Sequence, residues 1–225
     1  FADKAKADGK PAEMIDNIPS GTSANRTTVA GYTAETVTLK PLSCVKDSII
    51  SYDAQYTLID NLVIDAVNMD CGQWWSYGVQ FKNAFNRIQN SEIKNSRYGV
   101  GIGGGDASHS NVYSGLKIHD NGLSDFEHGI YLWTDNNIIE NSEIYNNAGW
   151  GIHFYPKGAN NIFRNNKIYN NARVGLRGAG IIMSAGSGNE AYGNIIWGNS
   201  GGISTYLGAS NSKIYNNTVY DNRRG

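Results

Sequence analysis

The sequence predicts an all-β chain folded as a parallel solenoid with three faces. One observation is an aliphatic residue in an Asn-x-x-Ile element that recurs at intervals of about 24 residues, as fixed-period repeats do. This column contains Ile64, Ile93, Ile118, Ile144, Ile168, Ile196 and Val219. The other two observations are a second apolar column and a glycine-led strand in each interval. Three short alternating strands per repeat suit a three-faced coil, because alternation directs one set of side chains inward and the other outward.

The second apolar column lies just upstream of the first and contains Ile59, Ile88, Tyr113, Ile139, Phe163, Ala191 and Ile214. Glycine-led strands are expected at residues 78–81, 99–102, 129–132, 151–154, 180–183 and 202–205. Their inward residues should be Val79, Val100, Ile130, Ile152, Ile181 and Ile203. The Leu-x-x-Leu-x-Leu signature of leucine-rich repeats is absent. We therefore expect about seven regular coils, stacked about 4.8 Å apart.

Asparagine marks one corner of each coil. Asn121, Asn147, Asn171, Asn199 and Asn222 each stand just after a residue of the first column. Asparagine tolerates the left-handed backbone of a sharp corner, and stacked asparagine side chains can hydrogen-bond along a ladder. These residues are predicted to form the corners, with glycine at the others.

Taken in order, residues 1–57 are expected to form an N-terminal segment and irregular first coils. Residues 58–225 should form the regular coils, and the pattern is expected to continue beyond Gly225. The whole is one domain, since a solenoid has no separate globular cores. Cys44 and Cys71 are about one repeat apart, so the sequence allows either a disulfide between adjacent coils or two buried thiols.

Composition limits the partners. The formal net charge is −1, so no global field favours nucleic acid or an anionic membrane. No apolar run is long enough for a membrane-spanning helix, which would need about 18 residues or more. Neither nucleic acid binding nor membrane insertion is predicted.

The Asn-x-x-Ile elements, Asn-Asn corners and Gly-Ile strands between Leu58 and Asn222 resemble the right-handed parallel β-helix proteins. This group includes pectate-lyase-like polysaccharide lyases and alginate epimerases. The resemblance implies a single right-handed coil, a polysaccharide partner, and an extracellular or cell-surface location. It also leaves room for further domains of a longer chain. One fold hosts many functions, so the activity has to be argued from residues.

An aromatic surface is expected on the outward side of the glycine-led strands. Alternation directs Tyr131, Trp133 and Tyr206 outward, beside His153 and Tyr155, and long insertions add Trp74 and Trp75. Aromatic rings cover the apolar faces of sugars while polar groups meet the hydroxyls. The alternative is that aromatic residues simply pack well on a sheet. A second outward column, His119, Tyr145, Tyr169, Trp197 and Tyr220, is interpreted as structural.

Elimination or epimerisation at a uronic acid needs a base near the sugar ring and a group that stabilises the enolate-like charge. His153 or Tyr155 could act as the base. Lys82, Lys157 and Arg177 are candidate cations.

Calcium could serve the same purpose through hard oxygen ligands. Asp106, Asp125, Glu127 and Asp135 are the candidate calcium ligands. The stretch Asp125-Phe126-Glu127-His128 is similar to the Asp-Pro-His-Glu signature of alginate epimerases, but proline is absent and His and Glu are exchanged. His128 is instead interpreted as one member of an aromatic corner stack.

Two other functions remain open. A glycoside hydrolase would need two carboxyl groups across the scissile bond, but the sequence sets of β-helical polygalacturonases are missing. A non-catalytic carbohydrate-binding or structural module of a larger secreted or cell-surface protein is the main alternative. Titratable groups clustered in a groove favour an enzyme, and a groove of aromatic and Asn side chains alone favours binding.

Overall fold

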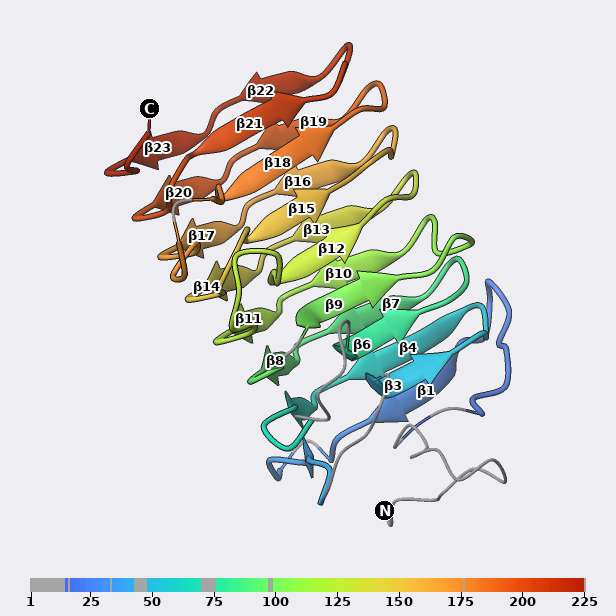
Figure 1. Cartoon of the computed structure of the whole chain (residues 1–225). Coiled ribbons are helices and arrows are strands. Elements are labelled where there is room, and N and C mark those ends of the chain that lie inside the picture. The colour runs from blue at the N-terminus through green and yellow to red at the C-terminus, as the bar shows by residue number, and fades with distance from the viewer. Residues whose placement is uncertain are drawn as a thin grey trace.

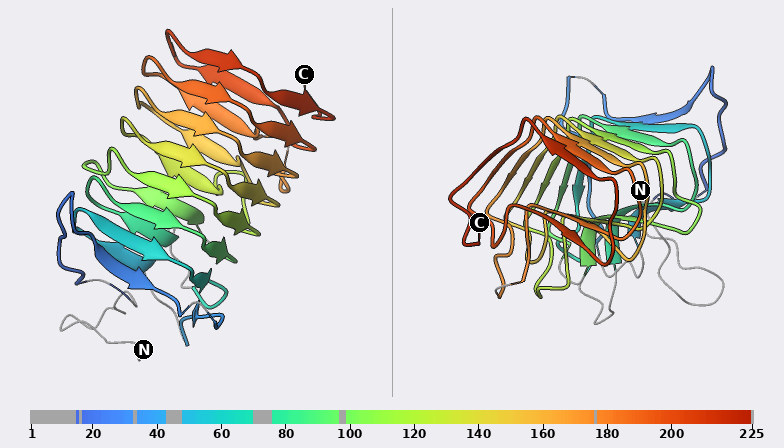
Figure 2. Two further views of the ribbon diagram at one scale, coloured as in Figure 1. Left: turned by 180° about the vertical axis from the view of Figure 1, so that it is seen from behind. Right: turned by 90° about the horizontal axis from the view of Figure 1, so that it is seen from above.

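The structure is a computed structural model that describes residues 15, 17–32, 34–42, 48–69, 76–96, 99–175 and 177–224, with only the backbone at Gly99 and Val100. Short strands build three parallel sheets, and no residue in these ranges is helical. The coils stack along one axis from the N-terminal to the C-terminal end (Figure 1). Seen from behind and from above, the same strands follow one another coil by coil (Figure 2). The predicted three-faced parallel β-helix of about seven coils is confirmed.

The three sheets are named after their first strands. The β1 sheet contains β1 (Thr27–Ala30), β4 (Thr57–Asp60), β7 (Arg87–Gln89), β10 (Val112–Ser114), β13 (Ile138–Glu140), β16 (Ile162–Arg164), β19 (Glu190–Tyr192) and β22 (Lys213–Tyr215). The β2 sheet contains β2 (Thr38–Leu39), β5 (Val63–Asp65), β8 (Glu92–Lys94), β11 (Lys117–His119), β14 (Glu143–Tyr145), β17 (Lys167–Tyr169), β20 (Ile195–Trp197) and β23 (Thr218–Tyr220). The β3 sheet contains β3 (Ser48–Tyr52), β6 (Ser76–Phe81), β9 (Gly99–Gly104), β12 (Ile130–Leu132), β15 (Ile152–Phe154), β18 (Ile181–Ser184) and β21 (Ile203–Tyr206).

The apolar columns form the core. Ile118 of β11 pairs with Ile93 on one side and Ile144 on the other, and all three are fully buried. The second apolar column also points into the core, and its Tyr113 is fully buried in the β1 sheet. Each such side chain contributes about 1.5–3 kcal/mol on burial. The last coil of the first column is the exception to this burial, because Val219 is 46% exposed. The two columns predicted from the sequence are therefore the interior of the solenoid.

The register of β9 differs from the prediction. Val79 pairs with Ile102, and Ile102 pairs with Ile130, so Ile102 rather than Val100 lies in the core column. The glycine in register with Gly129 is accordingly Gly101 and not Gly99. The run of alternating glycines in β9 offers two registers that differ by two residues, and both keep the same alternation. The buried Ile102 side chain selects between them.

The corner asparagines also differ from the prediction. The left-handed residue is the one before the ladder residue: Asn146 has φ 53° and Asn170 has φ 53°. Asn147 and Asn171 are buried instead, and Asn147 Nδ2 donates to Asn171 Oδ1 at 2.9 Å. The predicted hydrogen-bonded ladder is thus present, but the turn and the ladder use neighbouring residues. A buried amide needs such partners, since an unpaired one costs about 1–3 kcal/mol.

Some predictions fall on residues outside the described ranges. Cys44, Cys71, Trp74 and Trp75 are among them. Within the described ranges, no helix is long and apolar enough to cross a membrane.

Candidate functional site

A hollow of about 460 Å³ lies on the outward side of the β3 sheet. We call it the aromatic groove, and its walls are Tyr77, Asp106, Tyr131, Trp133, Pro156 and Lys157. Outward alternation along β12 and the residues after it places Tyr131 and Trp133 on one side of the chain. The structure therefore brings together four residues named from the sequence: Asp106, Tyr131, Trp133 and Lys157.

Tyr77 was missed by the sequence reasoning, and Gly103 explains its position. Gly103 stands between Gln80 and Tyr131 in the outward column of the β3 sheet. A Cβ on Gly103 would lie only 2.1 Å from Cε1 of the Tyr77 ring. The ring thus covers the space that a side chain at position 103 would fill, and it adds an aromatic wall to the groove. Burial, with a smaller contribution from Tyr131, raises the pKa of Tyr77 to about 12.

The rings around the groove are tilted against one another. Tyr131 and Trp133 have centroids 5.5 Å apart with an interplanar angle of 56°. Tyr131 and His153 pair across strands, 5.1 Å apart at 66°, and Tyr155 lies 5.5 Å from His153 at 37°. Because tilted rings do not cover each other's faces, such an arrangement leaves ring faces available to a ligand.

A second hollow, of about 330 Å³, adjoins the groove at the corner that follows the β3 sheet. This corner hollow is lined by Asp106, His109, Trp133, Thr134, Asp135, Asn136 and Lys157. Asp106 accepts a hydrogen bond from Trp133 Nε1 at 2.8 Å, which fixes the indole between the two hollows. Asp135 accepts from the backbone N–H of Ala159 at 2.7 Å. Lys157 forms no ion pair with the described residues, so its ammonium group can meet an anion of a ligand.

A cluster of His128, Trp150 and His153 borders the groove next to Tyr131. Nδ1 of His153 lies 3.0 Å from Nε2 of His128, and the His153 ring stacks on Trp150 at 4.6 Å. Burial lowers the pKa of His153 to about 4. The pKa of His128 falls well below its usual range because of burial and the neighbouring His153, and the carbonyl of Glu127 offsets this only in part. His128 is 2% exposed, and its ring meets Trp150 edge-on, with centroids 4.9 Å apart at 85°, so the two rings are packed together but not stacked.

The other predicted cations lie elsewhere. Arg177 Nε is 4.0 Å from Asp125 Oδ2, and its guanidinium lies over the Phe126 ring at 5.6 Å. These residues precede the strands of the β3 sheet, whereas Lys157 follows them. Lys82 is exposed and packs its backbone against Gly105. Neither Arg177 nor Lys82 lines the aromatic groove, and the same is true of Tyr206, which is exposed on β21.

The four predicted calcium ligands are not gathered into one group. Asp106 and Asp135 share the corner hollow, but Asp125 and Glu127 precede β12, at the other end of the strand. Both Leu123 and Ser124 donate their backbone N–H to Glu127 Oε2, at 2.5 and 2.8 Å. Among the described residues no group of three or more His, Cys, Asp and Glu side chains could hold a metal ion. The set as predicted does not fit calcium, which takes about 6–8 oxygen ligands.

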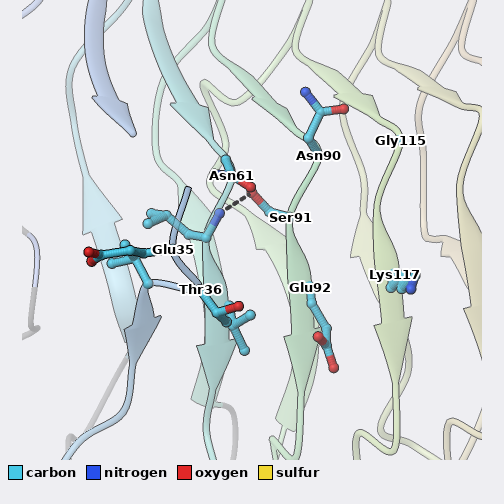
Figure 3. Close-up of a pocket in the computed structure, with 11 residues that line it drawn as sticks. Glu35, Thr36, Asn61, Asn90, Ser91, Glu92, Gly115 and Lys117 are labelled. Carbon is cyan, nitrogen blue, oxygen red and sulfur yellow. Dashed lines mark hydrogen bonds between the residues drawn. The ribbon is translucent and has the colours of Figure 1, made fainter. Parts of the chain in front are cut away.

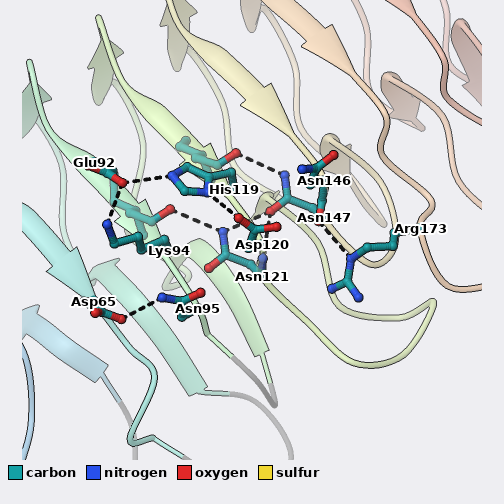
Figure 4. Close-up of polar contacts among 12 residues, drawn as sticks. Asp65, Glu92, Lys94, Asn95, His119, Asp120, Asn121, Asn146, Asn147 and Arg173 are labelled. Atoms are coloured by element: carbon teal, nitrogen blue, oxygen red, sulfur yellow. Dashed lines mark hydrogen bonds and ion pairs between the residues drawn. The ribbon is translucent and has the colours of Figure 1, made fainter.

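The second aromatic column forms a different kind of surface on the β2 sheet. Tyr145 and Tyr169 stack 4.9 Å apart at 2°, and Tyr169 and Trp197 stack 4.3 Å apart at 8°. Such face-to-face stacking leaves ring edges outward. At its N-terminal end, His119 is held between Glu92 and Asp120, at 3.0 and 2.7 Å (Figure 4). The arrangement fits the structural interpretation.

A polar hollow of about 400 Å³ lies at the corner between the β1 and β2 sheets (Figure 3). Asn61, Ser91, Glu92 and Lys117 are among its lining residues, and the backbone N–H of Leu62 donates to Ser91 Oγ at 3.2 Å. Glu92 is already paired with Lys94 and His119. This hollow has no aromatic wall, so the aromatic groove remains the better candidate site.

Known proteins share this architecture. The chain matches the model of the right-handed beta helix region over residues 47–219, whereas no curated protein sequence matches it. Pectate lyase Pel9A superposes with a TM-score of 0.69 and 11% identity, over 100% of this chain and 66% of that chain. The Dettilon tailspike protein superposes with a TM-score of 0.63 and 18% identity, over 92% of this chain and 46% of that chain. An alginate lyase from Paenibacillus sp. str. FPU-7 superposes with a TM-score of 0.50 and 17% identity, over 93% of this chain and 87% of that chain.

These identities show a shared fold and nothing finer. The chain spans 66% of the length of the pectate lyase and 46% of the tailspike protein. The family match extends from just before β3 to β23 and thus includes every strand of the β3 sheet. Together with the three in-register parallel sheets, it shows that the chain belongs to the right-handed β-helix family.

Proposed function

We propose that this protein acts on an acidic polysaccharide in the aromatic groove, by elimination or epimerisation at a uronate. The observation that carries the proposal is the combination in one hollow of Tyr77, Tyr131 and Trp133 with Lys157, whose ammonium group forms no ion pair with the part of the chain that the structure describes. The rings supply apolar contacts for sugar faces, and Lys157 supplies a partner for a carboxylate. Structural neighbours that include a pectate lyase and an alginate lyase support the choice of polymer.

The groove matches an extended chain in direction and size. Tyr77 comes from β6, Tyr131 from β12, and Lys157 from the loop after β15, so the walls extend over several coils. At about 4.8 Å per coil, this is roughly the length of two to three sugar residues along the solenoid axis. A polymer bound this way places one uronate near Lys157 and its neighbours over the rings.

The chemistry needs a proton acceptor close to the sugar and a group that stabilises the developing negative charge. His153 and Tyr155 border the groove, and Tyr155 is 37% exposed. Lys157 is the cation best placed for the uronate carboxylate. Arg177 and Lys82, at other positions on the surface, have no direct part in this proposal.

Calcium dependence remains a separate proposal with a narrower ligand set. Only Asp106 and Asp135 of the four predicted ligands share a hollow beside the groove. Two carboxylates leave most of the coordination to the substrate and water. We derive no step through the ion, and a comparison of activity with added calcium and with a chelator tests it.

The test is to incubate the protein with a panel of uronate polymers and to follow the ultraviolet absorbance of the unsaturated product, with NMR of the polymer to detect epimerisation. We expect a signal with at least one polymer, lost in Trp133→Ala and Lys157→Ala. Trp197→Ala, which removes a ring from the stacked column on the β2 sheet, is the matched control and should retain activity. Processing that persists in both groove variants would refute the placement of the site.

Two specific observations keep other functions in view. An aromatic groove is sufficient for binding, so a non-catalytic module predicts calorimetric binding that Trp133→Ala abolishes, with no chemical change in any polymer. Asp106 and Asp135 share the corner hollow, so a glycoside hydrolase predicts new reducing ends without unsaturation. We also propose an extracellular or cell-surface location, where such polymers occur.

A further inference from the structure

Another hollow, of about 310 Å³, lies at the corner between the β2 sheet and the β3 sheet, in the C-terminal coils. We call it the arginine hollow. Two of the described residues that line it are charged, and both are arginines, Arg173 and Arg223. Neither side chain forms an ion pair within the part of the chain that the structure describes. The hollow therefore gathers two positive charges in a protein whose formal net charge is −1.

The backbone holds the guanidinium group of Arg173 in place. Its Nε donates to the carbonyl oxygen of Asn146 at 3.1 Å (Figure 4), and its Nη2 donates to that of Gly122 at 2.8 Å. A guanidinium group has five N–H donors, and these contacts use the edge formed by Nε and Nη2. The edge formed by Nη1 and Nη2 remains, and it is a fork that binds an oxyanion through two parallel hydrogen bonds. Because carbonyl oxygens carry no formal charge, the positive charge of Arg173 is not neutralised.

The second arginine lies two coils further along the axis. Arg173 and Arg223 both follow the asparagine ladder, with one coil between them. At about 4.8 Å per coil, their coils are about 9.6 Å apart. The intervening coil contributes Gly198 and Ser200 to the hollow, and these small residues leave the space between the arginines open. One oxyanion fits between two guanidinium groups at this spacing, since charge-assisted N–H···O contacts are about 2.7–2.9 Å long.

Two asparagine amides complete the wall of the hollow. Asn146 and Asn170 stand at the left-handed corner positions of successive coils. Neither side-chain amide forms a hydrogen bond within the described ranges. An Asn amide can donate to a hydroxyl group or accept from one. In the next coil this corner is Gly198, and a Cβ there would lie 2.3 Å from Asn170 Oδ1, so the amide reaches over the glycine. The hollow thus offers partners for hydroxyl groups beside its two cations.

The nearest carboxylates do not neutralise the arginines. Asp120 precedes Asn146 in the corner column, and its Oδ2 is 2.7 Å from Nδ1 of His119. Asp221 follows Gly198 in the same column and is exposed to solvent. Neither aspartate lines the hollow. An anion from solution is therefore the natural partner of the two guanidinium groups.

We propose that the arginine hollow is a binding site for an oxyanion, a carboxylate or sulfate group, which Arg173 and Arg223 hold from two sides. An acidic sugar and a free inorganic anion both present this chemistry, and a sugar also brings hydroxyl groups for Asn146 and Asn170. The hollow precedes the strands of the β3 sheet, whereas Lys157 of the aromatic groove follows them. The site is thus separate from the groove, and the proposal does not depend on what the groove does.

The test is a titration of the ¹⁵N-labelled protein with sodium sulfate, with sodium glucuronate and with uncharged glucose, at constant ionic strength. The readout is ¹H–¹⁵N NMR of the backbone amides and the arginine Nε–H groups. We expect saturable shifts at Gly198, Ser200 and Arg173 Nε–H with at least one of the two anions, and none with glucose. Tighter binding of glucuronate identifies an acidic sugar as the ligand, and equal or tighter binding of sulfate identifies a free inorganic anion. If neither anion gives a saturable shift, or if glucose gives the same shifts, the proposal is wrong.

Substitutions locate the bound anion. Arg173→Gln and Arg223→Gln should each raise the dissociation constant about tenfold or more, because each removes a charge-assisted contact. Arg223 is exposed in the last coil, so its variant keeps the test decisive if Arg173→Gln does not fold. Arg224→Gln is the matched control, since it removes the same charge one residue further along and Arg224 does not line the hollow. It should change the dissociation constant less than about twofold. Equal losses of affinity in Arg223→Gln and Arg224→Gln would show a diffuse positive field and overturn the proposed site.

Discussion

Replacement of Gly103 by alanine tests the construction of the aromatic groove with a single methyl group. The new Cβ would lie 2.1, 2.2 and 2.9 Å from three carbons of the Tyr77 ring. Carbon atoms in contact are about 3.5–4.0 Å apart, so the overlap exceeds roughly 1 Å and the ring has to leave its position. The backbone at Gly103 does not need a left-handed conformation, because no positive φ occurs there. The expected effect of Gly103→Ala therefore comes from the steric clash with the Tyr77 ring and not from backbone strain.

The magnitude follows from the lost contact between Tyr77 and a bound sugar. If the ring covers about 50 Å² of apolar sugar surface, the loss is about 1.2 kcal/mol at roughly 25 cal/mol per Å². The dissociation constant for the polymer should then rise about eightfold. The free energy of unfolding should fall as well, by about 1–3 kcal/mol, because the ring is forced into a packed region.

The assay is calorimetric titration with the polymer that the wild-type protein binds, together with urea unfolding. Gly201→Ala is the matched control, since its Cβ would meet the nearest atom only at 3.6 Å and should change neither quantity appreciably. In a Tyr77→Ala background, Gly103→Ala should weaken binding no further. Unchanged affinity in the single variant, or full additivity in the double variant, would refute the position of Tyr77 on the groove.

Three further predictions concern stability. Asn171→Ala should lower the free energy of unfolding by about 3–5 kcal/mol in a urea titration, since it unpairs several buried groups. Asn222→Ala should lower it clearly less, because the Asn222 side chain is only partly buried. Because the pKa of His153 is about 4 in the folded protein, the unfolded chain binds more protons than the folded one between about pH 6.5 and 4. The free energy of unfolding should therefore fall by about 3 kcal/mol for this residue as the pH falls through this window. If His153→Gln keeps the full pH dependence of the free energy of unfolding, this reasoning is wrong. Trp197→Ala should lower the free energy of unfolding by about 1–3 kcal/mol, because the stacking on Tyr169 is lost. A thermal midpoint of unfolding equal to that of the wild type would argue against a structural role for the aromatic column of the β2 sheet.

The fold could be predicted from the sequence because each core position is repeated in every coil. Ile118 is informative only together with Ile93 and Ile144, which occupy the same column. Where the repeat is ambiguous the predicted register was wrong, as in β9, because glycines on alternate positions of this strand allow two registers with the same alternation. The turn and ladder roles of Asn146 and Asn147 could not be separated either, since both are asparagine.

The candidate site was predictable only in part. Strand alternation gave the outward direction of Tyr131 and Trp133, but it says nothing about loops. The sequence predicts both Lys157 and Arg177 as candidate cations in loops beside the same sheet, without showing which of them faces the groove. They lie beyond opposite ends of its strands, because one loop follows the strand and the other precedes it. The contact of His128 with His153 depends on ring orientation across two strands, for which the sequence has no pattern.

The two aromatic surfaces show why the site lies where the repeat is broken. On the β2 sheet, successive coils place rings at the same height, and neighbours such as Tyr145 and Tyr169 cover each other's faces. On the β3 sheet, the outward column changes from Gly103 to Tyr131 to His153, and the Tyr131 and His153 rings tilt at 66° instead of stacking. The stacked column of the β2 sheet has a ring in each of five successive coils and uses the ring faces for stability, so it offers a ligand only edges. In the β3 sheet, Gly103 interrupts the outward column and leaves the space that the Tyr77 ring covers, so the aromatic groove forms where the aromatic column is interrupted.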